Sequence, residues 1–157
     1  MIDVNAAYLN TELNEDIYIE APREHPLYNK GYLKLNKALY GLKQAGKEWN
    51  ETLNNTLIKM IFRRLVSEPC IYIKENNSKK IIRIISIYVD DLLFAGRAKE
   101  IMYVKEQIKM YFNIKDIGDV NFVIGIKFKK CHDGYIIHQK QYIKDLLVKF
   151  KLILCPS

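Results

Sequence analysis

The sequence is poor in cysteine, with only Cys70, Cys131 and Cys155 among its 157 residues. They are odd in number, lie far apart and show no C-x-x-C spacing, so we expect neither a disulfide framework nor a zinc site. No apolar run approaches the roughly 18 uncharged residues of a membrane span, and the N-terminus lacks the layout of a signal peptide. We therefore expect a protein of the cytoplasm or nucleus that is not secreted and has no membrane partner.

Proline and glycine are also scarce, at four and seven residues, and no linker rich in Pro, Gly or Ser interrupts the chain. We find no internal repeat, no low-complexity tract, no Gly-rich phosphate loop and no Ser-His-Asp arrangement. The sequence thus predicts one continuous domain. Acidic side chains are outnumbered by basic ones, 18 to 25, which gives a formal charge of +7. This excess favours a polyanionic partner such as nucleic acid, although solvated lysines on helix faces would produce the same count.

Hydrophobic periodicity predicts alternating strands and helices. Strands are expected at residues 1–4, 15–22, 32–35, 70–74, 81–89, 92–96, 120–128 and 135–139. Helices are expected at residues 5–13, 44–61, 99–112 and 141–150. This order indicates an α+β fold in which helices back one face of an antiparallel sheet. Trp49, Leu53 and Leu57 recur every four residues, so we assign Trp49 to core packing and not to base stacking.

Two adjacent carboxylates, Asp90 and Asp91, interrupt an apolar run, "SIYVDDLLFAG". They could form the polar tip of a hairpin, since Asp is a good turn residue. They could instead bind metal, because Mg²⁺ prefers carboxylate oxygens and two such ions can activate an attacking oxygen and neutralise a leaving pyrophosphate. A third carboxylate would complete that site. Spacing alone leaves four candidates for it: Asp3, Glu12, Glu15 and Asp16.

Four motifs occur in a distinctive order: "DVNAAYLN" (3–10), "LYGLKQAG" (39–46), "YVDD" (88–91) and "KDIGDVNFVIGIKF" (115–128). With "SEPCIYIK" (67–74) and "QYIKDLLVKF" (141–150), they resemble the reverse transcriptase of copia-type LTR retrotransposons over nearly the whole chain. The resemblance implies a polymerase palm with a ferredoxin-like, split βαβ core at residues 1–130. Residues 131–157 would be the end of the primer-grip hairpin and the start of the thumb. The fingers, most of the thumb and the ribonuclease H region of the parent polyprotein are expected to be missing.

The same resemblance implies a metal site. Asp3, Asp90, Asp91 and the backbone carbonyl of Val4 would hold two Mg²⁺ ions, with Mn²⁺ as an alternative. Tyr8 matches the aromatic steric gate that excludes a 2′-hydroxyl, although without the family we would assign Tyr8 to the core.

Further positions match segments that contact substrates in the family. Those expected to contact the nucleotide and template are Tyr40, Gly41, Lys43 and Gln44. The hairpin that grips the primer matches residues 122–126, including Phe122 and Gly125. The chain departs from the family at Gly46, usually a proline, and at Thr11 and Ile61, usually glycines. We expect the change at Ile61 to extend the preceding helix past its normal end.

The implied reaction is attack of a primer 3′-hydroxyl on a deoxynucleoside triphosphate, directed by an RNA or DNA template, in the cytoplasm, virus-like particles or nucleus. We expect this chain alone to have little or no such activity. A first alternative is a non-catalytic, basic nucleic-acid-binding remnant of such an element. A second is another two-metal enzyme, a nuclease or transposase, although such enzymes lack the "LYGLKQ" and "FVIGI" segments.

Overall fold

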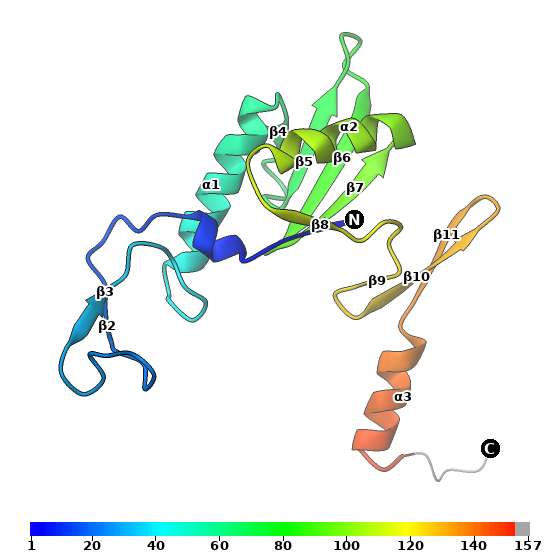
Figure 1. The fold of residues 1–157 in the computed structure, drawn as a ribbon. Coiled ribbons are helices and arrows are strands. Elements are labelled where there is room, and N and C mark those ends of the chain that lie inside the picture. The colour runs from blue at the N-terminus through cyan, green and yellow to red at the C-terminus, as the bar shows by residue number, and fades with distance from the viewer. Residues whose placement is uncertain (153–157) are drawn as a thin grey trace. The chain divides into compact units, whose positions relative to one another are not determined.

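The computed structural model describes residues 1–152 (Figure 1). Contacts divide the chain into a first compact unit, Met1–Ile117, and a second that begins at Gly118. Of the three cysteines, Cys70 and Cys131 are free thiols, and Cys155 lies outside the described residues. In the part of the chain that the structure describes, no helix is both long enough and apolar enough to cross a membrane.

The first unit is built on a six-stranded sheet with the strand order β4-β5-β6-β7-β1-β8. Its strands are β1 (Ile2–Val4), β4 (Arg63–Arg64), β5 (Ile71–Glu75), β6 (Ile81–Tyr88), β7 (Asp91–Gly96) and β8 (Ile114–Asp116). Every neighbouring pair is antiparallel. The sequence did not predict β4 and β8, the two edge strands, because two or three residues are too few to show an alternating pattern.

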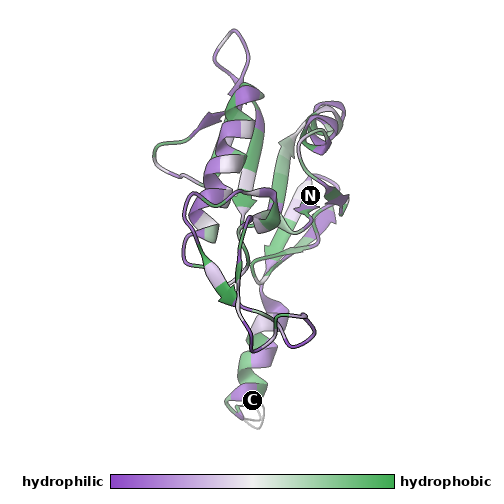
Figure 2. Ribbon diagram, turned by 60° about the vertical axis from the view of Figure 1, so that its left-hand side comes forward, coloured by the Kyte–Doolittle hydropathy of each residue, from purple (hydrophilic) through white to green (hydrophobic). Residues whose placement is uncertain are grey.

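Two helices, α1 (Ala45–Lys59) and α2 (Ala98–Lys109), cover one face of this sheet (Figure 1). Figure 2 shows hydrophilic and hydrophobic residues mixed along α1, as expected of an amphipathic helix. The inward-facing side chains of sheet and helices form one core, whose fully buried members include Ile2, Leu53, Leu57, Tyr72, Ile85, Leu92 and Ile108. Each such side chain contributes about 1.5–3 kcal/mol by its burial. The predicted sheet backed by helices on one face is therefore confirmed.

Helix α1 ends near its predicted end, but not in the predicted way. The N–H of Ile61 donates to the carbonyl of Ile58 at 2.8 Å, and the N–H of Phe62 donates to that of Leu57 at 3.0 Å. These two bonds make a Schellman motif, which places the residue after the cap in the left-handed region. Ile61 has φ 63° there. The expectation that Ile61 extends the helix is wrong, because the chain accepts a left-handed isoleucine where the family has glycine.

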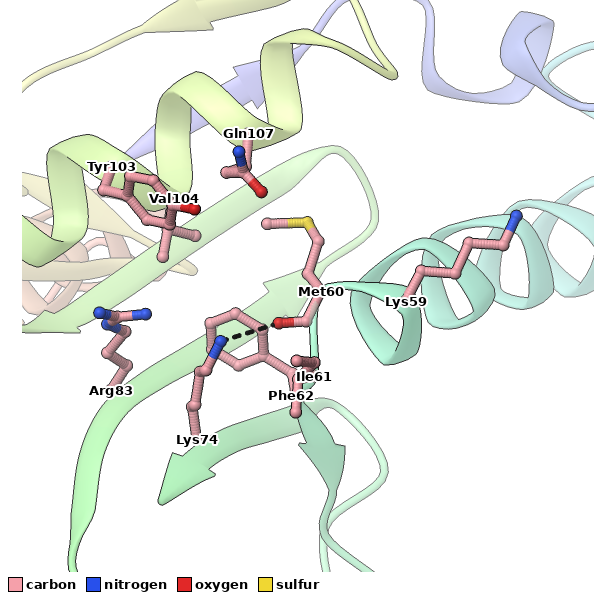
Figure 3. Close-up of a pocket in the computed structure, with 9 residues that line it drawn as sticks. All are labelled: Lys59, Met60, Ile61, Phe62, Lys74, Arg83, Tyr103, Val104 and Gln107. Carbon is pink, nitrogen blue, oxygen red and sulfur yellow. Dashed lines mark hydrogen bonds between the residues drawn. The ribbon is translucent and has the colours of Figure 1, made fainter. Parts of the chain in front are cut away.

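Figure 3 shows the space beside this helix end, a cavity of about 140 Å³ between α1, α2 and the sheet. The Lys74 ammonium points into it and donates to the Met60 carbonyl at 3.0 Å. Burial, and then the neighbouring Arg83 charge, lower the pKa of Lys74. The Lys74 side chain therefore fixes the last turn of α1 to strand β5.

Before α1 the chain forms short elements. A single 3₁₀ turn, η1 (Ala7–Asn10), replaces the helix predicted over 5–13. Strands β2 (Tyr18–Glu20) and β3 (Tyr32–Lys34) pair as a two-stranded antiparallel sheet, so both predicted strands form in shortened versions. The strand that was expected to stop at Pro22 ends two residues earlier.

The second unit contains β9 (Phe122–Val123), β10 (Ile126–Cys131), β11 (Gly134–His138) and α3 (Lys140–Lys149). Periodicity predicted one strand over 120–128. The structure instead breaks it at Ile124 and Gly125, whose φ values of 49° and 76° make a two-residue hairpin turn. The hairpin implied by the family resemblance therefore forms, and β10 and β11 form a second hairpin with His132 and Asp133 at its turn.

Candidate active site

The aspartate pair lies at the tip of the β6–β7 hairpin. Tyr88 pairs with Asp91, which leaves Val89 and Asp90 as the two turn residues. Val89 has φ 56°, and Asp90 has no positive φ, which is the pattern of a type II′ turn. Glycine usually fills that first position. A β-branched residue in the left-handed region costs about 1–2 kcal/mol, so this turn is strained.

Strand β1 brings Asp3 to the same place. Asp3 is the register partner of Asp91, one residue along from the buried pair of Ile2 and Leu92. Because side chains alternate along a strand, Asp3 and Asp91 lie on the sheet face away from the helices. The N–H of Val4 donates to the carbonyl of Asp90 at 2.8 Å. Two hydrogen-bonded segments thus bring the three aspartates together.

The other acidic candidates have different partners. Glu15 accepts a hydrogen bond from the Gln44 amide at 3.1 Å, and Asp16 forms an ion pair with Lys34 at 2.6 Å. Glu12 lies at an isolated bridge between the segments before β2 and after β3. Of the four candidates that spacing left open, Asp3 is the one that lies beside the aspartate pair.

The charges of the other two aspartates act on the Asp91 carboxylate. Burial, followed by the charges of Asp90 and Asp3, raises the pKa of Asp91. A hard divalent cation would relieve this repulsion, and three carboxylates are donors of the type that Mg²⁺ prefers, so the donor set fits such an ion. Within residues 1–152, however, no three acidic, His or Cys side chains gather closely enough to enclose a metal. Some side-chain rearrangement would have to accompany metal binding.

Tyr40 occupies one oxygen of Asp90. Its hydroxyl donates to Asp90 Oδ2 at 3.0 Å. Desolvation, and then this hydrogen bond, raise the pKa of Tyr40 to about 12. The Tyr40 ring packs against Tyr8, with ring centroids 4.1 Å apart. Two residues expected to contact the nucleotide, Tyr8 and Tyr40, therefore lie beside the aspartates.

The residues that follow Tyr40 lead into helix α1. Gly41 has φ 99° and open space around its Cα, so its conformation, not crowding, favours glycine. Lys43 is exposed. Gln44 is the N-cap residue of α1, and its amide is bonded to Glu15.

Phe122 and Gly125 belong to the second unit. Phe122 is 58% exposed on β9, and Gly125 is the second residue of the β9–β10 turn. The aspartates, Tyr8 and the Tyr40–Gln44 segment are all in the first unit.

Trp49 makes a contact that sequence reasoning missed. Its indole Nε1–H donates to the carbonyl of Val89 at 2.6 Å. The predicted packing role is confirmed, since Trp49 is 2% exposed and meets Phe112 edge to face at 5.1 Å. A periodic pattern can show that an indole is buried, but not what its N–H bonds to.

Comparison with known proteins identifies the family. The whole chain, residues 1–157, matches the family described as "Reverse transcriptase (RNA-dependent DNA polymerase)". The chain belongs to the reverse transcriptase family. The family is one of RNA-directed DNA polymerases, and the predicted copia-type resemblance is confirmed.

The relatives are transposon proteins. The chain is 31% identical over 156 residues to the retrovirus-related Pol polyprotein from transposon TNT 1-94 of Nicotiana tabacum, covering 96% of the chain and 12% of the relative. It is 32% identical to that from transposon RE1 of Arabidopsis thaliana, covering 97% and 10%. It is 35% identical to a putative transposon Ty5-1 protein of Saccharomyces cerevisiae, covering 86% and 44%. The chain thus spans less than half of each of these relatives. No solved structure matches it significantly.

Proposed function

We propose that this chain is the palm of a copia-type reverse transcriptase, which adds deoxynucleotides to a primer 3′-hydroxyl by two-metal catalysis. Residues 1–130 would form the palm, and residues 131–157 the end of the primer grip and the start of the thumb. The observation that carries this proposal is the pairing of Asp3 with Asp91 beside Asp90, in a chain that belongs to this family.

The three aspartates and the Val4 carbonyl would hold Mg²⁺, or Mn²⁺ as an alternative. The bound cations would neutralise charge on the triphosphate and the attacking oxygen. The protein contributes position, since its strands fix Asp3 and Asp91 before any substrate arrives. No nucleophilic side chain is required, because phosphoryl transfer depends mainly on positioning and charge neutralisation.

Substrate contacts would come from the aromatic pair and from the segment before α1. Tyr8 would lie below the incoming sugar and exclude a 2′-hydroxyl, with Tyr40 packed against it. Gly41, Lys43 and Gln44 would contact the nucleotide and template. In the second unit, the hairpin turn after Phe122, which includes Gly125, would grip the primer.

The partners would be a template-primer, a deoxynucleoside triphosphate and the fingers, thumb and ribonuclease H regions of a Pol polyprotein. The formal charge of +7 suits a nucleic-acid partner. We place the activity in the cytoplasm, including virus-like particles, or the nucleus. The chain spans only 12% and 10% of two Pol relatives, so we expect little polymerase activity from it alone.

A non-catalytic nucleic-acid-binding role is the second candidate. It is favoured by the basic charge and by the lack of a closely gathered metal-binding group in the described residues. The two candidates differ in their need for metal, since charge-driven binding weakens with salt but does not depend on a carboxylate.

Primer extension on poly(rA)/oligo(dT) with Mg²⁺ distinguishes them. We would compare the chain, the same chain joined to family-type fingers, and Asp90→Asn in both. Asp133→Asn is the matched control, because Asp133 is an exposed aspartate at another hairpin tip. We expect primer extension only from the chain that is joined to fingers. Asp90→Asn should abolish that extension, and Asp133→Asn should leave it unchanged. Salt-sensitive binding without extension in any folded protein would support the second candidate instead.

A further inference from the structure

The turn that carries Asp90 needs support from outside the hairpin. Its first residue, Val89, holds a left-handed backbone (φ 56°) that valine rarely adopts. Such a conformation persists only where the surroundings determine it. Val89 is 37% exposed, so the packing of its own side chain is an incomplete constraint.

Both backbone carbonyls of the turn accept hydrogen bonds from other elements. The Val89 carbonyl accepts from Trp49 Nε1–H of α1 at 2.6 Å. The Asp90 carbonyl accepts from the Val4 N–H of β1 at 2.8 Å. The turn is therefore fixed on one side by the strand that carries Asp3 and on the other by an indole in the core.

Trp49 is well suited to hold a carbonyl in place. It is almost fully buried, it packs against Phe112, and it lies within a 15-residue helix. An indole has one N–H donor and no acceptor, so the Val89 carbonyl takes its whole hydrogen-bonding capacity. A donor fixed in this way prevents the Val89–Asp90 peptide from rotating.

We propose that Trp49 is a positioning residue, which holds the strained Val89–Asp90 turn so that Asp90 and Asp91 stay aligned with Asp3. The inference rests on the proposed metal site. Without the indole N–H the peptide after Val89 rotates, the turn relaxes and the Asp90 carboxylate leaves its place. The ring of Trp49 supplies core packing, and its N–H supplies the geometry of the metal site.

The test removes the N–H while keeping the ring. Trp49 is the chain's one tryptophan, so benzothienylalanine incorporated at this position deletes the donor and retains the shape. Trp49→Phe is the simpler variant. Tyr72→Phe is the matched control, because Tyr72 is a fully buried aromatic of the same core whose hydroxyl donates to Asn54 Oδ1 at 2.9 Å, far along the chain from the turn.

The first readout is the Mg²⁺ affinity of the 157-residue chain, measured from the NMR chemical shifts of the Asp90 and Asp91 backbone amides. The second is the hydrogen-exchange rate of the same two amides without metal. We expect both N–H deletions to weaken Mg²⁺ binding about tenfold and to speed exchange at the turn, whereas Tyr72→Phe changes affinity less than twofold. Equal losses in Trp49→Phe and Tyr72→Phe, or no loss with benzothienylalanine, would overturn the proposal.

A rescue experiment separates positioning from general stability. Glycine adopts a positive φ without strain, so Val89→Gly lets the turn form unaided. In that background the tenfold effect of Trp49→Phe should shrink to less than twofold, which a double-mutant cycle measures. An undiminished effect would contradict the proposed role.

The metal-free exchange keeps this test independent of the proposed function. If the unmodified chain and Asp90→Asn respond identically to Mg²⁺, the metal site fails. Faster exchange at Asp90 and Asp91 on N–H deletion would then still support the positioning role, and unchanged exchange would refute it.

Discussion

Asp3 and Asp91 face each other directly across the antiparallel pair of β1 and β7, next to the apolar pair of Ile2 and Leu92. Like charges in this relationship destabilise a sheet by about 0.2–1 kcal/mol. Both strands are interior to the six-stranded sheet. The protein therefore carries an unfavourable charge pair at a position where an apolar or oppositely charged pair would be more stable, as expected where a function requires both carboxylates.

The first prediction is that Asp91→Asn stabilises the protein at neutral pH. The raised folded-state pKa of Asp91 means that folding favours its protonated form. Its contribution is therefore unfavourable at pH 7, and stability falls as pH rises through the window between the unfolded and folded pKa values. We expect Asp91→Asn to gain about 0.5 kcal/mol at pH 7, an amount reduced by solvent screening. Urea denaturation at several pH values measures it. If Asp91→Asn is still more stable at acidic pH, where Asp91 is protonated, charge repulsion is not the cause of the stabilisation.

The second prediction concerns the end of α1. Ile61→Gly removes the backbone strain of an isoleucine at φ 63°. The free energy gained in this way exceeds the entropic cost of ordering a glycine on folding. Since Ile61 is 75% exposed, little packing is lost, and we expect a net gain of about 0.5–1 kcal/mol. Ile58→Gly, within the same helix, is the control and should lose about 1 kcal/mol. Thermal melting of both variants is sufficient. Destabilisation by Ile61→Gly would mean that the isoleucine side chain is needed.

The third prediction contrasts two ion pairs. Lys105 of α2 is 8% exposed, and its ammonium lies 2.6 Å from Asp116 of β8. Asp116→Asn leaves a buried ammonium without its counter-charge, and with Asp116 half exposed we expect a loss of about 1–2 kcal/mol. The Lys130–Asp119 pair is exposed on both sides, so Asp119→Asn should cost less than about 0.5 kcal/mol. The free energy of unfolding of both variants is measured by denaturant titration. If Asp116→Asn and Asp119→Asn lose equal stability, burial of Lys105 does not strengthen its ion pair.

The fourth prediction is that Tyr40 titrates late. Its pKa of about 12 arises from desolvation and from the hydrogen bond to Asp90. At pH 11 the Tyr40 hydroxyl should thus remain mostly protonated, whereas a free tyrosine ionises near pH 10. The absorbance difference at alkaline pH between the protein and Tyr40→Phe isolates this group. Asp90→Asn should lower the pKa, and ionisation of Tyr40 near pH 10 in the unmodified protein would show that the hydrogen bond does not persist.

Sequence patterns predicted the parts of the fold that depend on periodicity. The four-residue spacing of Trp49, Leu53 and Leu57 located α1, because burial of one helix face imposes that spacing. The turns were harder to predict. Val89 and Ile124 both adopt positive φ, which a β-branched residue does only under tertiary constraint. Asp90 and Asp91 indicated a possible hairpin tip, but no local signal predicted Val89 as the first turn residue.

In the candidate site too, local sequence predicted some features and tertiary contacts determined others. The apolar setting of Asp90 and Asp91 marked them as unusual, but spacing alone could not choose between Asp3 and Glu12. The family resemblance implied Asp3, and the pairing of β1 with β7 places it opposite Asp91. The bond from Trp49 to Val89 joins residues 40 positions apart. Such a contact depends on how α1 packs against the hairpin, and no local sequence signal encodes it.

The central claim, that Asp3, Asp90 and Asp91 form one metal site, is tested most directly by adding Mn²⁺ to the 157-residue chain and following paramagnetic broadening of its backbone amides. The account predicts that broadening centres on these three residues and disappears in Asp90→Asn but not in Asp133→Asn. Broadening centred elsewhere, or equal broadening in Asp90→Asn, would contradict it.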